Sequence, residues 1–410
     1  MTDPIRLADS ARRQFLRGSL VTGLGLATQP LWAWAATTET QPFGNGEREL
    51  IAYPQKRPLM RITTRPPHLE TPFEVFNEGL LTPNDAFFVR YHLANIPTRI
   101  DPATYRISVS GCVTRPLSLS LAELMALGEP VEVVAVNQCS GNSRGYFQPR
   151  VFGAQLGNGS MGNARWVGLP LRTLLNHAGV QPNARQVTFR GLDRPVLPVT
   201  PSVIKALDVD HALSPEPLIA WRMNGEDLPM LNGYPIRLVV PGYFGTYWIK
   251  HLNEIQVIDH EFRGFFMQKA YRVPDNPSES VPPGMTLTSS RPISRLPVRS
   301  FITSLKDGQQ LLLGQTQALR GIAFDGGSGI QAVDISDDGG HTWLPTRLGE
   351  SLGPYSFREW KTDWRPRQRG PLELLVRARN VRGEIQPSEP TWNPGGYARH
   401  SIEALPLLII

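Results

Sequence analysis

The chain has 410 residues, of which 40% are hydrophobic and 19% are charged, and its formal net charge is +6. This length exceeds that of one ordinary hydrophobic core, so we expect two domains with additional segments. The mild basicity excludes the concentrated positive charge of a nucleic-acid-binding protein, and it suits a small anionic substrate or an acidic partner.

The first 35 residues have the features of an export signal. The pair Arg12-Arg13 precedes a weakly apolar run at 18–34, and the end of that run resembles a small-x-small cleavage site. Features in this order indicate a twin-arginine signal and predict that the protein is exported to the periplasm. The apolar run is too short to span a bilayer, and no other stretch reaches that length, so we expect no transmembrane segment.

Two regions with different patterns follow the export signal. Residues 36–80 are polar and proline-rich, which predicts an extended segment that wraps the surface. Residues 81–283 alternate between short strands and helices in irregular order, as is typical of the α+β class. Three stretches have a helical pattern: 120–127 with a serine N-cap, 170–179 with proline at its start and glycine at its end, and 201–207.

The pattern changes in the C-terminal part of the chain, residues 284–410. Short strands are separated by turn signals at a spacing of about ten residues. The clearest pieces are the strands at 330–336 and 372–379 and the Asp-Asp-Gly-Gly turn at 337–340. This region is predicted to form a small β-sandwich.

Two polar side chains share one face of a strand predicted at residues 87–92. Arg90 and His92 are two positions apart, and side chains alternate between the two faces of a strand, so both point the same way. Arg90 offers a planar fork of donors for an oxyanion, and His92 offers a second donor. We therefore expect an anion-binding site on this face.

Cys139 ends a β-branched strand and begins a polar turn that contains Arg144. A thiolate is stabilised by a nearby cation or by a metal ion, so Cys139 is a candidate soft metal ligand. The sequence has two cysteines. In an exported protein they can pair, so a Cys112–Cys139 disulfide is the alternative. Without that pairing, we expect Cys112 to be a buried and inert thiol.

Five motifs in one order resemble the sulfite oxidase family of molybdenum enzymes. The resemblance covers roughly residue 73 to the C-terminus and is greatest for the bacterial periplasmic sulfite dehydrogenases. The motifs are FFVRYH (87–92), NQCSGNSR (137–144), GNARWVGLP (162–170), NGYPIRLVVPGYFGTYWIK (232–250) and QPSEPTWNPGGY (386–397).

The resemblance implies a fold, a cofactor and a set of site residues. A mixed α/β domain would hold one molybdenum per chain as Mo-molybdopterin, and an immunoglobulin-like β-sandwich would form a homodimer. Cys139 would be the protein ligand of the metal. The residues that border the substrate would be Arg90, His92, Arg144 and Tyr271. The positions that hold the cofactor together with Cys139 would be Asn232, Arg237, Trp248, Ile249 and Lys250.

The sequence departs from the vertebrate and plant members of this family at one position. Those members have an arginine two residues after the terminal Trp-Asn motif, and this chain has Gly395 there. One anion-binding cation is therefore missing or supplied differently. No Cys-x-x-Cys-His motif occurs in the sequence, so we expect no c-type haem in this chain.

The resemblance predicts that the protein oxidises sulfite, or a similar small oxyanion, and passes single electrons to a c-type cytochrome. We expect no nucleic-acid partner. The nearest alternative is a periplasmic molybdopterin reductase of methionine sulfoxide or another sulfoxide. A second alternative, from another class, is a cofactor-free binding protein with a Cys112–Cys139 disulfide.

Overall fold

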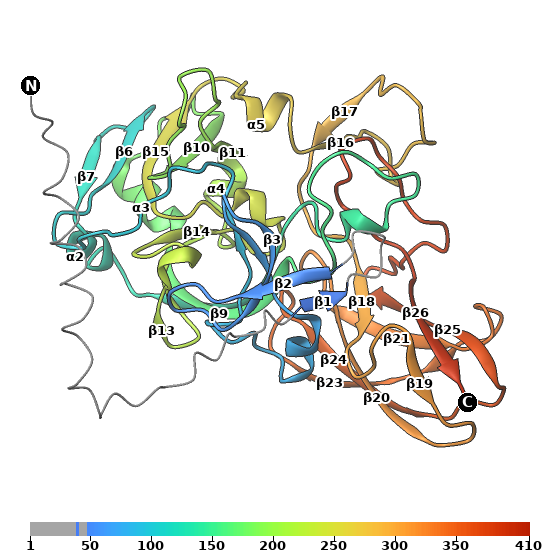
Figure 1. The fold of residues 1–410 in the computed structure, drawn as a ribbon. Coiled ribbons are helices and arrows are strands. Elements are labelled where there is room, and N and C mark those ends of the chain that lie inside the picture. The colour runs from blue at the N-terminus through green and yellow to red at the C-terminus, as the bar shows by residue number, and fades with distance from the viewer. Residues whose placement is uncertain (1–37, 41–46) are drawn as a thin grey trace, which may run out of the picture. The chain divides into compact units, whose positions relative to one another are not determined.

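The computed structural model describes residues 38–40 and 47–410, and the predicted export segment at 1–35 lies outside them. Among these residues, no helix combines the length and the apolar composition needed to cross a bilayer. The described chain is mostly strand with a few short helices, and it fits a mixed domain followed by a β-sandwich (Figure 1).

The first sheet is antiparallel and has the strand order β1-β2-β3-β4-β5. Its strands are β1 (Thr38–Thr40), β2 (Glu47–Ile51), β3 (Leu59–Thr63), β4 (His68–Glu70) and β5 (Val89–Arg90). Leu69 and Val89 face each other across β4 and β5 and pack with Leu59 in a small apolar core. The same register places His68 opposite Arg90, which brings two polar side chains to one edge of the sheet.

The second sheet has the order β11-β10-β15-β6-β7 and contains one parallel pair, β15 with β6. Its strands are β6 (Ile107–Gly111), β7 (Leu117–Leu119), β10 (Gln186–Gly191), β11 (Ile204–Asp208) and β15 (Leu252–Ile258). The predicted helix at 201–207 is wrong, because β11 occupies most of it. Pairing with β10 across Phe189 and Lys205 outweighs the local helical pattern.

The third sheet carries the strand that leads to Cys139. It has the order β13-β12-β9-β8, with β14 paired to β12. Its strands are β8 (Val131–Gln138), β9 (Met161–Pro170), β12 (Leu218–Met223), β13 (Glu226–Asp227) and β14 (Arg237–Val239). Strand β8 pairs with β9 along its whole length, and its last five residues are buried. Cys139 therefore follows a rigid strand.

Helices in this part of the chain are short. The α-helices are α2 (Leu121–Met125), α3 (Leu171–Ala178), α4 (Val209–Ala212) and α5 (Phe265–Gln268), and the 3-10 helices are η1 (Phe73–Asn77), η2 (Arg144–Tyr146), η3 (Met230–Asn232) and η4 (Gly245–Tyr247). Ser120 and Glu123 form a capping box at α2, and Gly179 ends α3 with a φ of 75°. Both helices are confirmed where the sequence predicts them.

The C-terminal part forms two sheets, preceded by a β16-β17 ribbon; their strands are coloured orange to red in Figure 1. One sheet has the order β18-β20-β24-β23 and the other β19-β26-β25-β21-β22. The strands are β16 (Arg272–Pro274), β17 (Ser290–Pro292), β18 (Arg299–Ile302), β19 (Gln309–Leu311), β20 (Gln317–Phe324), β21 (Ile330–Ser336), β22 (Leu344–Pro345), β23 (Arg347–Ser351), β24 (Arg358–Trp364), β25 (Gly370–Asn380) and β26 (Glu403–Ile409). Trp360 from one sheet and Leu374 from the other share an apolar core, as in a β-sandwich.

The sandwich also packs against the preceding sheets. Phe76 and Phe357 meet edge to face in an apolar core to which both parts of the chain contribute. The backbone N–H of Val136, in β8, donates to the carbonyl of Tyr355 at 2.9 Å. The strand that leads to Cys139 is therefore supported from the sandwich side.

Candidate active site

A cavity lies where β5, the end of β8 and the segment 245–250 meet. Most of the predicted site residues line it: Arg90, His92, Cys139, Asn232, Arg237, Trp248, Ile249, Lys250 and Tyr271. Residues from segments up to 181 positions apart in the sequence are thus brought to one place, as the motifs predict.

Cys139 is a free thiol at the wall of this cavity. Its N–H donates to the carbonyl of Ser160 at 2.9 Å, and its side chain is half-buried. Cys112 is also free, so the alternative of a Cys112–Cys139 disulfide is wrong. The Cys139 sulfur is available to a ligand in the cavity.

Arg90 and His92 both line the cavity, although their strand is shorter than predicted. Strand β5 contains only Val89 and Arg90, because β4, its partner, is itself short. The His92 ring contacts the hydroxyl of Tyr271. Burial, and then the charge of Arg90, hold the pKa of His92 well below its ordinary range. His92 is therefore neutral at pH 7, with one ring nitrogen as a hydrogen-bond donor and the other as an acceptor.

Tyr271 has an unusual backbone conformation for a tyrosine, with a φ of 59°. Its ring packs against His92 and against Tyr397, with centroid distances of 5.4 and 5.1 Å. Burial raises the pKa of Tyr271, so its hydroxyl keeps its proton at neutral pH. The strained position delivers a protonated phenol to the cavity beside a neutral imidazole.

Buried cations form another part of the cavity wall. A backbone bridge pairs Arg237 with Lys250. Arg237 donates to the carbonyls of Asn232 and Trp248 at 2.8 and 3.2 Å and lies over the ring of Trp166. Burial lowers the pKa of Arg237 to about 9, and burial together with the charge of Arg237 lowers that of Lys250 to about 7. Both groups would gain stability from a bound anion.

Two further charged groups act on this wall and carry no clear sequence signal. Lys56 is buried, and its ammonium group donates at 2.6 Å to the side-chain oxygen of Asn232, which lines the cavity. Lys56 lies in the proline-rich segment that was predicted only to wrap the surface. Among the described residues that line the cavity, Asp193 carries the one carboxylate, and Arg90, Arg237 and Lys250 carry cationic groups. The charged lining residues thus carry an excess of positive charge.

Several buried polar atoms in the lining have no hydrogen-bond partner among the described residues. They are Asn137 Oδ1, Ser140 Oγ, Thr246 Oγ1 and Arg237 Nε. Buried polar groups of native proteins are normally paired, so these atoms indicate a polar ligand in the cavity. Donors, acceptors and cations together fit a polar organic cofactor that carries a phosphate.

The described residues contain no group of three or more His, Cys, Asp or Glu side chains placed to hold a metal ion. A metal beside Cys139 would therefore need further ligands from an organic cofactor. Cys139 as a single thiolate and a cofactor held by the cationic wall are compatible with that requirement.

Arg144 is the predicted site residue that is absent from the cavity lining. It begins η2, and this turn directs its guanidinium to the carbonyls of Gly395 and Gly396, with N–O distances of 3.3 and 3.2 Å. The resemblance implied that Arg144 borders the substrate, and the structure places it beside the cavity lining and not in it. Its charge offsets only part of the effect of burial, which raises the pKa of Tyr271.

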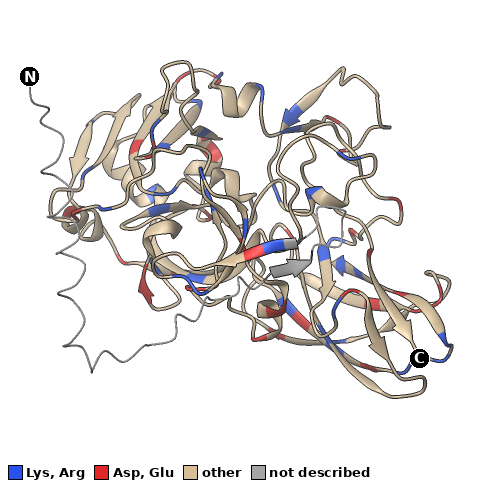
Figure 2. Ribbon diagram, in the orientation of Figure 1, with Lys and Arg blue, Asp and Glu red and all other residues tan. Residues whose placement is uncertain are grey.

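Charges outside the cavity do not form one basic face. In Figure 2 the Lys and Arg positions are interspersed with Asp and Glu along the described ribbon.

Two sequence profiles match the chain. The "Oxidoreductase molybdopterin binding domain" matches residues 92–266, and the "Mo-co oxidoreductase dimerisation domain" matches residues 290–401. The first profile spans Cys139 and the cationic wall. The second spans most of the β-sandwich and the segment that contacts Arg144.

Known proteins are similar to this chain in sequence and in fold. Sulfite oxidase from Gallus gallus is 33% identical over 360 residues, which are 84% of this chain and 76% of that protein. The mitochondrial sulfite oxidase of Rattus norvegicus is also 33% identical, and there the match spans 64% of the protein. The solved structure of the sulfane dehydrogenase SoxCD from Paracoccus pantotrophus has a TM-score of 0.70 at 22% identity, covering 94% of this chain and 93% of that chain.

Proposed function

The chain belongs to the sulfite oxidase family of molybdopterin oxidoreductases, and we propose that it oxidises sulfite to sulfate and passes the electrons singly to a c-type cytochrome. In this reaction one sulfite and one water give one sulfate, two protons and two electrons. The observation that carries the proposal is the meeting of the Cys139 thiol with Arg90, His92 and Tyr271 in one cavity with excess positive charge.

The cofactor that we propose is Mo-molybdopterin, with one molybdenum per chain. Cys139 would bind the metal, and the residues that would hold the organic part are Asn232, Arg237, Trp248, Ile249 and Lys250. Lys56 would act through its hydrogen bond to Asn232. When bound, the cofactor supplies the two-electron redox and oxygen-transfer chemistry, and the protein supplies binding, orientation and charge.

The chain's own residues would bind and orient sulfite. Arg90 would hold the oxyanion with its planar fork of donors. The Tyr271 hydroxyl would donate its one hydrogen bond to the substrate, while the ring N–H of neutral His92 would donate to the phenol oxygen and orient it. Tyr271 is buried and His92 is half-buried, which limits the access of bulk water to the reacting group.

Each rival function leaves part of the site unexplained. A sulfoxide is neutral and does not need Arg90 beside a proton-donating Tyr271. A cofactor-free binding protein would leave Asn137, Ser140 and Thr246 with buried unpaired polar atoms. It would also lack the disulfide that this alternative requires.

The proposal also covers the location of the protein, its oligomeric state and its electron acceptor. A twin-arginine signal fits a protein that receives its cofactor before export to the periplasm. The β-sandwich, which we propose is immunoglobulin-like, would form a homodimer, in line with the dimerisation profile at residues 290–401. The acceptor would be a c-type cytochrome on a separate chain.

The deciding experiment measures molybdenum content and sulfite-dependent reduction of cytochrome c on the same purified protein. We expect close to one molybdenum per chain and cytochrome reduction that requires sulfite. Reduction of methionine sulfoxide without sulfite oxidation would instead support the sulfoxide reductase. Protein without molybdenum, from a host that makes the cofactor, would support the binding protein.

A further inference from the structure

The loop that carries Cys139 is held by residues far along the chain. The N–H of Ala398 donates to the carbonyl of Ser140 at 3.0 Å. Arg144, at the other end of the loop, donates to the carbonyls of Gly395 and Gly396. The loop is therefore bonded at both ends to the segment just before β26.

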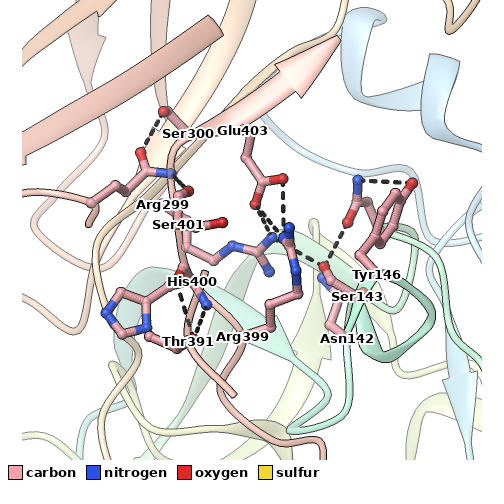
Figure 3. Close-up of polar contacts among 12 residues, drawn as sticks. Asn142, Ser143, Tyr146, Arg299, Ser300, Thr391, Arg399, His400, Ser401 and Glu403 are labelled. Atoms are coloured by element: carbon pink, nitrogen blue, oxygen red, sulfur yellow. Dashed lines mark hydrogen bonds and ion pairs between the residues drawn. The ribbon is translucent and has the colours of Figure 1, made fainter. Parts of the chain in front are cut away.

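A third contact reaches the middle of the loop from inside the sandwich. Arg299 begins β18 and is completely buried, and its Nη2 donates to the Ser143 hydroxyl at 3.0 Å. The same nitrogen donates to Glu403 at 2.5 Å, and Arg399 pairs with Glu403 at 3.1 Å. Figure 3 shows both guanidinium groups converging on Glu403, with Ser143 beside them.

Ser143 is well placed to pass this contact on to Cys139. It has a φ of 68°, and its N–H donates to the carbonyl of Gly157 at 2.7 Å. Its hydroxyl donates to Asn158, so an oxygen lone pair is left for Arg299. The preceding residue, Asn142, donates its N–H to the carbonyl of Cys139 at 3.0 Å. One short path of bonds thus joins Arg299 to Cys139.

Stability alone is a poor reason for this arrangement. A buried ion pair adds little over an apolar pair of similar volume, because desolvation offsets the attraction. Arg299 Nε and Nη1 also have no hydrogen-bond partner among the described residues, which is a further cost. Arg299 Nη2 is shared between Glu403 and the Ser143 hydroxyl, so this buried cation reaches the Cys139 loop as well as its ion partner.

We propose that Arg299 is a positioning residue for Cys139, which fixes the Cys139 loop through Ser143 and so makes the sandwich part of the catalytic geometry. The importance of this geometry for turnover rests on the proposed function, but the mechanical coupling does not. Arg299 acts through Ser143 and does not line the cavity.

The test is Ser143→Ala, which removes the hydroxyl and leaves the Arg299–Glu403 pair intact. Hydrogen exchange of the purified enzyme with its cofactor is followed by mass spectrometry. We expect amides in the segment 140–145 to exchange about tenfold faster, while amides of β20 keep their rate. We also expect kcat for sulfite to fall about tenfold with KM within about twofold, because ligand geometry changes and Arg90 does not.

The matched control is Arg377→Gln, which breaks the ion pair of Arg377 with Asp334 inside the sandwich. It should lower thermal stability without changing exchange at 140–145. Arg299→Lys retains a cation for Glu403, and we expect it to show the same loop-specific exchange as Ser143→Ala. Unchanged exchange in the loop of Ser143→Ala, or an equal increase in β20, would overturn the proposal. If the wild type does not oxidise sulfite, only the proposed function is refuted, and hydrogen exchange still tests the coupling of Arg299 to the Cys139 loop.

Discussion

The guanidinium carbon of Arg144 lies 5.1 Å from the centre of the Tyr397 ring, and that ring in turn packs on Tyr271. A cation and two aromatic rings thus form a row that leads to the cavity. The Cβ of any side chain at Gly395 would come within 2.6 Å of the Tyr397 ring. Tyr397 therefore occupies the space beside the position where related enzymes were expected to have an arginine.

This row predicts a role for Tyr397 in substrate affinity. A cation over an aromatic ring is stabilised by about 1 kcal/mol, so Tyr397→Ala should release Arg144 and raise KM for sulfite about fivefold. Tyr397→Phe keeps the ring and should leave KM within about twofold. If the two residues act together, KM of the double variant Tyr397→Ala/Arg144→Gln should not exceed KM of the more impaired single variant. A double-mutant cycle in steady-state kinetics measures this. Fully additive effects would contradict the coupling.

The Tyr271 hydroxyl should matter for turnover more than for binding. Tyr271→Phe removes the group that contacts His92 and preserves the packing of the ring. We expect kcat to fall by about two orders of magnitude, the usual scale for loss of a positioned proton donor. Steady-state kinetics of Tyr271→Phe are compared with those of Tyr397→Phe. An unchanged kcat in Tyr271→Phe would refute the role of its hydroxyl in turnover.

Cys139 and Cys112 offer a matched pair for testing the metal ligand. Both are half-buried free thiols, but Cys139 lines the cavity. Cys139→Ser should lose sulfite oxidation while the organic cofactor still holds molybdenum, because a serine hydroxyl is a poor substitute for a soft thiolate. Cys112→Ser should keep both the activity and the metal, as metal analysis and kinetics can show. Retained turnover in Cys139→Ser would exclude Cys139 as the ligand.

Glu70 predicts a pH dependence of stability. Burial raises its pKa from 4.5 to about 7, against hydrogen bonds from Ser160 and Gly157. Between pH 4.5 and 7 the folded state therefore keeps a proton that the unfolded state has lost. The contribution of Glu70 to the free energy of unfolding is full below pH 4.5 and is lost as the pH rises through 7. Its size is about 3 kcal/mol from the two pKa values.

Urea unfolding at pH 5 and pH 8 tests this prediction. The wild type should lose more free energy of unfolding between these two pH values than Glu70→Gln, whose side chain does not titrate. Glu70→Gln should also be less stable than the wild type at pH 5. Its single amide oxygen accepts hydrogen bonds from Ser160 and Gly157 less well than the two carboxyl oxygens of Glu70 do. Equal losses in the two proteins would rule out Glu70 as the titrating group.

Motifs with local causes were predictable from the sequence. The capping residues Ser120 and Gly179 fixed the ends of two helices through their own backbone contacts. The cavity residues were found because five motifs occur together in one order, although no spacing rule places Arg90 near Lys250. The structure places them together through a hydrogen bond of 2.6 Å from the Lys250 ammonium to the carbonyl of Arg90.

Features with distant causes could not be predicted. Lys205 lies within a helical pattern, but pairing with β10 makes it part of a strand and buries it beneath the ring of Tyr247. Lys56 reaches Asn232 across 176 positions from a segment with no chemical motif. Arg144 was expected at the substrate because of the family resemblance, and its guanidinium instead donates to a carbonyl 251 residues away.

The bonds from Ala398 and from Gly395 and Gly396 to the Cys139 loop have a consequence for the order in which the enzyme matures. A chain is synthesised from its N-terminus, and its early domains begin to fold before its last residues exist. The residues of the cavity wall from Arg90 to Lys250 are synthesised before residues 395–398, so the bonds that hold the Cys139 loop cannot form until those later residues have emerged. We therefore expect these bonds to be among the last contacts that the cavity gains during synthesis.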